Sequence, residues 1–294
     1  MQEKPFAPRA WISRIQAHKL PVLEYSKQCL DGMRETEEEV TARHIVGVSV
    51  GDPLLAARMV VQAQSQRGQA LHHDVSTITG AIMMMGINPF LRTLSDLKSV
   101  EGILEEKSPE ALLEVMEIIR RARNAARYAY EWALWRVDTN IREIRLAALL
   151  HDLAEILLYV LEPSRALRIR ALLKANPGMR SADAQMKVLD CRISELQVAL
   201  CRAWKLPNLL LQLMDNKEAE NPRVKNVILA VNFARHLANK DSEEVLSGDL
   251  VEIAALLNIN VDALKKRFNL SRALEISQMP EVIQTSESSQ MPRL

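Results

Sequence analysis

Aromatic residues, glycine and cysteine are all scarce in this sequence of 294 residues. Only 4% of the residues are aromatic, and there are 9 glycines. No glycine-rich phosphate-binding loop is present, so a nucleotide-binding α/β fold has little support. The three cysteines, Cys29, Cys191 and Cys201, form no Cys-x-x-Cys pair. Their odd number favours a reducing compartment over a disulfide framework.

The sequence also lacks an excess of charge of either sign and any long apolar run. Its formal net charge is +1, so no global field favours nucleic acid or an anionic membrane. The first ten residues contain no apolar segment of a secretory signal, and no uninterrupted apolar run reaches transmembrane length. We therefore expect a cytoplasmic protein that binds neither membrane nor nucleic acid.

What the sequence does contain is typical of helices. Hydrophobic residues make up 48%, and Leu, Ala, Glu and Arg are abundant. Pairs such as Asp52-Pro53 and Ser108-Pro109 are helix starts, with a capping oxygen before a proline. We predict an all-α fold of two packed helical subdomains. The expected parts are an arm over residues 1–14, short helices over 15–107, a part with longer helices over 108–275, and a polar, disordered tail over 276–294. Three long helices are predicted, over residues 108–136, 140–161 and 181–205.

One polar pair, His151-Asp152, lies within an otherwise apolar run. Burying an imidazole beside a carboxylate is costly unless both groups are paired or ligate a metal. Leu150, Leu153 and Leu157 have the spacing of one helix face, so we expect the pair on a helix near the centre of the protein. The sequence therefore predicts either a metal site or the remnant of one, kept as a buried polar pair.

Several short segments occur in the order found in one known family. They are Leu20-Pro21-x-Leu23, Asp52–Ser65, Ile78–Gly86, Ala147–Asp152 and Trp204-x-Leu206-Pro207. Together they cover roughly residues 15–240 and resemble the HDOD family, bacterial signalling modules related to the HD-domain metal-dependent phosphohydrolases. The resemblance implies a multi-helical fold with an HD-like core in the second part. It also implies an output or adaptor role in signal transduction rather than catalysis.

The resemblance further implies where a metal would bind in a catalytic relative. The usual ligands are an upstream His, the His-Asp pair and a later Asp, and some relatives add a His beyond the W-x-L-P turn. In this sequence these positions fall near Asn124, on His151-Asp152, on Asn232 and near Asp215. Asparagine binds first-row metals poorly, because it has neither charge nor an imidazole nitrogen. We therefore expect no metal or other cofactor, and a degenerate cluster of Asn124, His151, Asp152 and Asn232 joined by hydrogen bonds. If a divalent metal does bind, His151 and Asp152 remain as its ligands.

Further candidate residues lie near this cluster or elsewhere in the chain. Glu155 lies one turn after His151, where an acid repels phosphate, and it is an alternative metal ligand. His72 and His73, in a polar loop, are another alternative. Three arginines of the helix predicted over 108–136 are candidates for binding an anion: Arg120, Arg123 and Arg127. A solvated helix face is the simpler interpretation of these arginines, because no aromatic residues alternate with them.

These observations favour a non-catalytic output or adaptor module that acts through a protein partner. The alternative is a metal-dependent phosphohydrolase acting on a nucleotide or cyclic dinucleotide, which needs ligands outside the assigned set. In a third hypothesis, the remnant of the metal site binds a nucleotide as a sensor, and nearby arginines hold the anionic group of that ligand. The sequence leaves the partner and the oligomeric state open.

Overall fold

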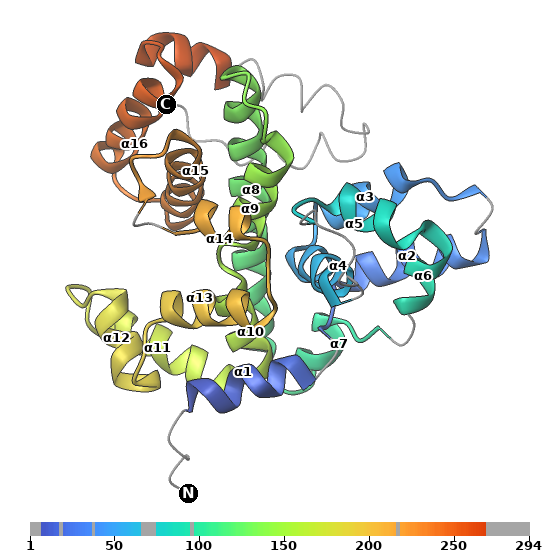
Figure 1. Ribbon diagram of the computed structural model, residues 1–294. Coiled ribbons are helices and arrows are strands. Elements are labelled where there is room, and N and C mark those ends of the chain that lie inside the picture. The colour runs from blue at the N-terminus through green and yellow to red at the C-terminus, as the bar shows by residue number, and fades with distance from the viewer. Residues whose placement is uncertain are drawn as a thin grey trace, which may run out of the picture. The chain divides into compact units, whose positions relative to one another are not determined.

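A computed structural model describes residues 7–17, 20–36, 39–65, 75–94, 97–215 and 218–268. Within these ranges the fold is all-α, as predicted, and the one backbone pairing of β type is an isolated bridge between Val22 and Ser99. The chain divides into two compact units, one ending at Lys240 and one beginning at Asp241 (Figure 1).

The larger unit begins with short helices. They are α1 (Pro8–Ala17), α2 (Glu24–Glu35), α3 (Ala42–Ser49), α4 (Pro53–Ser65), α5 (Ile78–Met85), α6 (Ile87–Thr93) and α7 (Val100–Leu104). Asp52 starts α4 as predicted, because its Oδ1 accepts the backbone N–H of Leu54 at 2.9 Å and of Leu55 at 3.0 Å. Its Oδ2 accepts the N–H of Leu23 at 2.8 Å. One buried carboxylate thus caps α4 and ties it to the segment that leads into α2.

Longer helices make up the rest of this unit. They are α8 (Pro109–Trp135), α9 (Ile141–Leu150), α10 (Leu153–Leu161), α11 (Pro163–Ala175), α12 (Ser181–Leu189), α13 (Ile193–Ala203), α14 (Asn208–Leu213) and α15 (Pro222–Asn239). The predicted start and end of α8 are confirmed. Its buried face is rich in alanine, so α9, α10 and α15 pack closely around it (Figure 1). Tyr128 and Trp132 of α8 stack with ring centroids 5.9 Å apart, and Phe233 of α15 packs edge-on against Tyr128.

Two of the predicted long helices are interrupted. The helix predicted over 140–161 divides into α9 and α10, so His151 and Asp152 lie in the turn between two helices and not within one. The helix predicted over 181–205 divides into α12 and α13, because Asp190 adopts a left-handed conformation with φ of 56°. Neither interruption contains Gly or Pro, the residues that usually indicate the end of a helix in a sequence.

The W-x-L-P segment is the end of α13. The N–H of Lys205 donates to the carbonyl of Arg202 at 2.9 Å, and the N–H of Leu206 donates to the carbonyl of Cys201 at 3.0 Å. This pair of bonds is a Schellman motif, with Lys205 in the left-handed region at φ 53°. Leu206 is buried, and Pro207 prevents the helix from continuing. The segment therefore directs the chain from α13 into α14.

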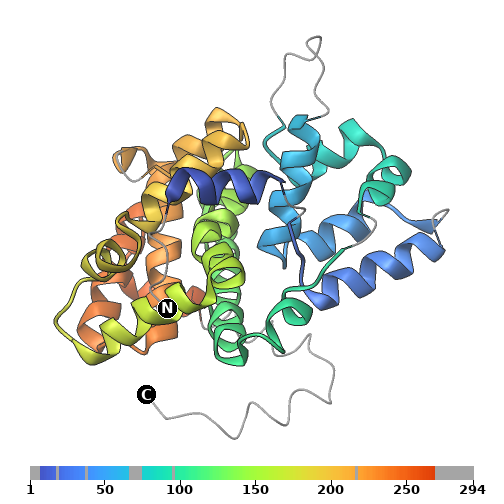
Figure 2. The same ribbon diagram turned by 90° about the horizontal axis from the view of Figure 1, so that it is seen from below.

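The first residues described do not extend away from the fold. Trp11 and Ile15 of α1 are buried, and the amide of Gln16 donates to the carbonyl of Ala203 at 2.8 Å, so α1 lies along α13 (Figure 2). The predicted division between residues 14 and 15 falls inside α1. The subdomain division near residue 108 stays a prediction. The predicted disordered tail over 276–294 lies outside the described residues.

The second unit contains α16 (Glu243–Leu257), and residues 261–268 are also helical. The side chain of Asn260 accepts the N–H of Ala263 at 2.7 Å and so caps the second of these helices. Among the helices described in both units, none combines the length and the apolar character needed to cross a membrane.

Candidate functional site

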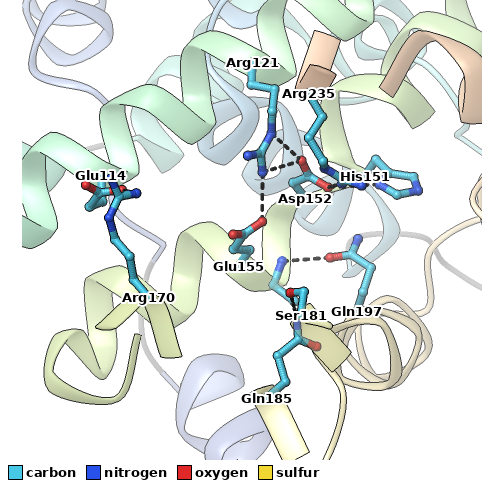
Figure 3. A network of polar contacts seen from close by, with 11 residues as sticks. Glu114, Arg121, His151, Asp152, Glu155, Arg170, Ser181, Gln185, Gln197 and Arg235 are labelled. Carbon is cyan, nitrogen blue, oxygen red and sulfur yellow. Dashed lines mark hydrogen bonds and ion pairs between the residues drawn. The ribbon is translucent and has the colours of Figure 1, made fainter. Parts of the chain in front are cut away.

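A glutamine from α13 forms hydrogen bonds to both sides of the turn between α9 and α10. The amide nitrogen of Gln197 donates to the carbonyl of Leu150 at 2.8 Å, and its oxygen accepts the N–H of Ala154 at 2.7 Å (Figure 3). These are the last carbonyl of α9 and an early N–H of α10, and Gln197 itself is buried. Because buried backbone groups need partners, Gln197 stabilises the break that places His151 and Asp152.

The carboxylate of Asp152 is surrounded by cationic and N–H donors from three elements. Arg121 of α8 donates to Oδ2 from Nε at 3.1 Å and from Nη2 at 2.9 Å. Arg235 of α15 donates to Oδ1 at 3.3 Å, and Nδ1 of His151 lies 3.0 Å from the same oxygen. Since a carboxylate oxygen only accepts hydrogen bonds, Nδ1 is the protonated nitrogen of His151. Arg121 also binds Glu155 of α10 at 2.9 Å. We call these five residues the Asp152 cluster (Figure 3).

The electrostatics of the Asp152 cluster follow from its burial. The side chain of Asp152 is 8% exposed and that of Arg121 is 13% exposed. Burial is the largest influence on the carboxyl of Asp152 and disfavours its charge, but the His151 hydrogen bond and the two guanidiniums outweigh burial and hold its pKa well below the ordinary value. Burial raises the pKa of Glu155, and Arg121 opposes that effect. Two carboxylates thus face two guanidiniums, so the cluster balances its charge with protein groups alone.

A divalent metal fits this arrangement poorly. The metal would need free carboxylate and imidazole lone pairs, yet both oxygens of Asp152 already accept from arginine. A metal at this carboxylate would also place its double positive charge beside the guanidiniums of Arg121 and Arg235. In the part of the chain that the structure describes, no group of three or more His, Cys, Asp or Glu side chains could hold a metal ion.

The asparagines assigned to the family's ligand positions are not partners of this carboxylate. Asn124 of α8 and Asn232 of α15 are half-buried, and neither forms a hydrogen bond to His151 or Asp152 among the described contacts. The residues that reach Asp152 lie three positions away on the same helices, Arg121 before Asn124 and Arg235 after Asn232. The need of a buried carboxylate for a cation is the signal that could have identified them.

The other sequence candidates lie apart from one another. Arg120 bonds to Glu117 on the surface, Arg123 donates to the carbonyl of Gly51, and Arg127 lies over the ring of Tyr128. These arginines have separate partners, and their role in binding an anion stays a prediction. Asp215 follows α14, and Glu155 is part of the cluster through Arg121. His72 and His73 lie outside the described residues.

Residues 25–220 match the HDOD domain, so the chain belongs to the HDOD family. A comparison with curated proteins finds no match.

Two solved structures are similar in fold. One is the MmoQ response regulator from Methylococcus capsulatus, with 18% identity and a TM-score of 0.62 over 81% of this chain and 98% of that one. The other is a virulence factor from Campylobacter jejuni, with 16% identity and a TM-score of 0.61 over 95% of this chain and 98% of that one. These likenesses confirm the all-α fold expected from the sequence.

Proposed function

We propose that this HDOD protein is a non-catalytic signal-transduction module that acts through a protein partner and uses no metal at His151-Asp152. The observation that carries the proposal is the pair of guanidiniums on Asp152. Arg121 and Arg235 occupy the carboxylate that a metal-dependent phosphohydrolase needs as a ligand.

Hydrolysis of a phosphoester at an HD-type site depends on the metal, which activates water and stabilises charge on the phosphate. The Asp152 cluster supplies neither effect, because its arginines are already bound to carboxylates. Glu155 adds a second carboxylate to the cluster, and a negative charge there repels phosphate. In place of catalysis, the cluster joins α8, α10 and α15, the helices that form the centre of this unit.

Membership of the HDOD family supports a role in signalling, because the family's HD-like domains are viewed as outputs and not as enzymes. The structural relative from Methylococcus capsulatus is described as a response regulator. A signalling output of this kind needs a surface for a partner protein. Exposed apolar side chains of the larger unit, among them Tyr25 and Met83, are candidates for that contact.

The experiment that tests the proposal is elemental analysis of the protein purified without chelator or histidine tag. We expect far less than one equivalent of Mn, Fe, Ni or Zn, and no metal-dependent cleavage of bis(p-nitrophenyl) phosphate or of a cyclic dinucleotide. The matched variants are Asp152→Asn and, as a control, Asp183→Asn, whose carboxylate pairs with Arg180 on the surface. One equivalent of metal that is lost only in Asp152→Asn, together with turnover, would overturn the proposal.

The protein partner requires a separate test. Crosslinking in cells should identify a partner, and the complex should then form from the two purified proteins. Substitution of Met83 by Glu should weaken that complex if the exposed face of α5 contributes. A purified chain that turns over a phosphoester without any partner would contradict the adaptor role.

A further inference from the structure

The larger unit also contains a cavity beside α9 whose lining includes none of the residues of the Asp152 cluster. A cavity of about 380 Å³ lies among α3, the start of α5, α8 and α9. This volume is in the range of pockets that bind small organic molecules. The helix α4 contacts both α8 and α9 and so holds the short helices beside them. None of the described residues that line the cavity is acidic.

Three arginines line this cavity: Arg43 from α3, and Arg142 and Arg145 from α9. Within the described part of the chain, none of the three has a hydrogen-bonding or ion-pairing carboxylate. This contrasts with Arg121 and Arg235, which are both paired. Three unpaired guanidiniums on one cavity produce a concentrated positive potential that a bound anion would relieve.

Arg145 provides the most specific sign of a missing partner. Its guanidinium lies over the ring of Tyr130, 5.1 Å from the centroid, and both residues line the cavity. The Nε–H of Arg145 is buried and has no acceptor among the described residues. A buried donor without an acceptor is unfavourable, so this N–H needs an acceptor that the described residues do not supply.

The remaining walls indicate what kind of anion fits. Thr77 and Thr79 line the cavity at the N-terminal end of α5, where the helix dipole favours negative charge, and the Thr77 hydroxyl oxygen accepts the N–H of Gly80 as a helix cap. Val46, Ile78 and Leu149 form apolar walls. A simple inorganic anion would leave these walls without a contact, whereas an organic phosphate would place its apolar or planar body against them.

We propose that this cavity binds a small organic phosphate, with the phosphate held by Arg43, Arg142 and Arg145 and the organic body held by the apolar walls and Tyr130. The site shares no residue with the Asp152 cluster, and it does not depend on the proposed function. It gives the protein a way to respond to a metabolite without any catalytic step.

The test is isothermal titration calorimetry on the full chain with ATP, GTP and cyclic di-GMP as probes and inorganic pyrophosphate as the comparison. We expect at least one of the three nucleotides to bind, and more tightly than pyrophosphate. Arg43→Ala and Arg142→Ala should each weaken that binding by about tenfold to a hundredfold, the range for a lost hydrogen bond to a charged group. Both arginines are exposed, so these variants should fold. Arg168→Ala, at an exposed arginine of α11, is the matched control and should leave binding unchanged.

Three results would overturn the inference. The first is no binding by any of the nucleotides. The second is binding that Arg43→Ala and Arg142→Ala leave unchanged, or that Arg168→Ala weakens equally. The third is pyrophosphate that binds as tightly as the nucleotides, because the apolar walls would then contribute nothing. Val46→Phe, which reduces the cavity from its apolar side, gives an independent check and should weaken nucleotide binding but not the fold.

Discussion

Replacing Arg121 by Met removes two of the hydrogen bonds that Asp152 receives and the ion pair between Arg121 and Glu155. The methionine keeps much of the apolar stem of the arginine, so the loss is mainly electrostatic. Breaking a buried ion pair by removing one partner costs about 3–5 kcal/mol. Arg235 and His151 still contact Asp152, and Arg235 is 38% exposed, so we expect a loss of about 3 kcal/mol in the free energy of unfolding at pH 7.

The pH dependence separates this explanation from simple loss of packing. The folded-state pKa of Asp152 is depressed, so its stabilising contribution is present above the pKa of the unfolded chain and is lost as the pH falls through the folded value. The pKa of Glu155 is raised, and removing Arg121 would raise it further because Arg121 opposes the effect of burial. In Arg121→Met both carboxylates should therefore accept protons more readily. The difference from wild type should shrink as the pH falls below about 5.

Urea unfolding of wild type, Arg121→Met and Arg120→Met at pH 7 and at about pH 3 measures both effects. Arg120 is the matched control, because it is the adjacent residue of α8 and pairs with Glu117 on the surface, where an ion pair is worth about 0–1 kcal/mol. The reasoning is refuted if the two variants lose equal stability at pH 7, or if the loss in Arg121→Met is as large at the lower pH.

Three further substitutions test other parts of the fold. Gln197→Leu should lower the free energy of unfolding in urea by about 2–4 kcal/mol, because the carbonyl of Leu150 and the N–H of Ala154 lose their buried partner. A loss under about 1 kcal/mol would contradict the role of Gln197 in the α9–α10 turn. Asp52→Ala should also lower the free energy of unfolding by about 2–4 kcal/mol, since it removes the cap of α4 and the acceptor of the Leu23 N–H. An unchanged urea midpoint would show that α4 does not need this cap. Val137→Gly should raise the free energy of unfolding by roughly 0.5–1 kcal/mol, because Val137 has a φ of 53°, which glycine adopts without strain. Thermal unfolding of the variant at a lower temperature than wild type would contradict this prediction.

The amino-acid sequence by itself determined the fold class and most helix starts. Asp52 caps α4, as its position before Pro53 indicates, whereas Ser108 precedes α8 without a capping hydrogen bond from its side chain. The order of short segments was enough to place the chain in the HDOD family, which the domain match confirms. These features depend on contacts within one or two helical turns, and such contacts can be inferred from neighbouring residues.

Only the tertiary structure decided what surrounds Asp152. Arg121 and Arg235 lie 31 and 83 residues from it in the sequence, and they meet it because of the register in which α8 and α15 pack around α9 and α10. The break at His151 depends in the same way on Gln197, a residue of another helix. A shift of one helical turn moves a side chain by about 5 Å, more than the length of a hydrogen bond. The sequence could therefore indicate a buried polar pair but not its partners, which depend on how the helices pack.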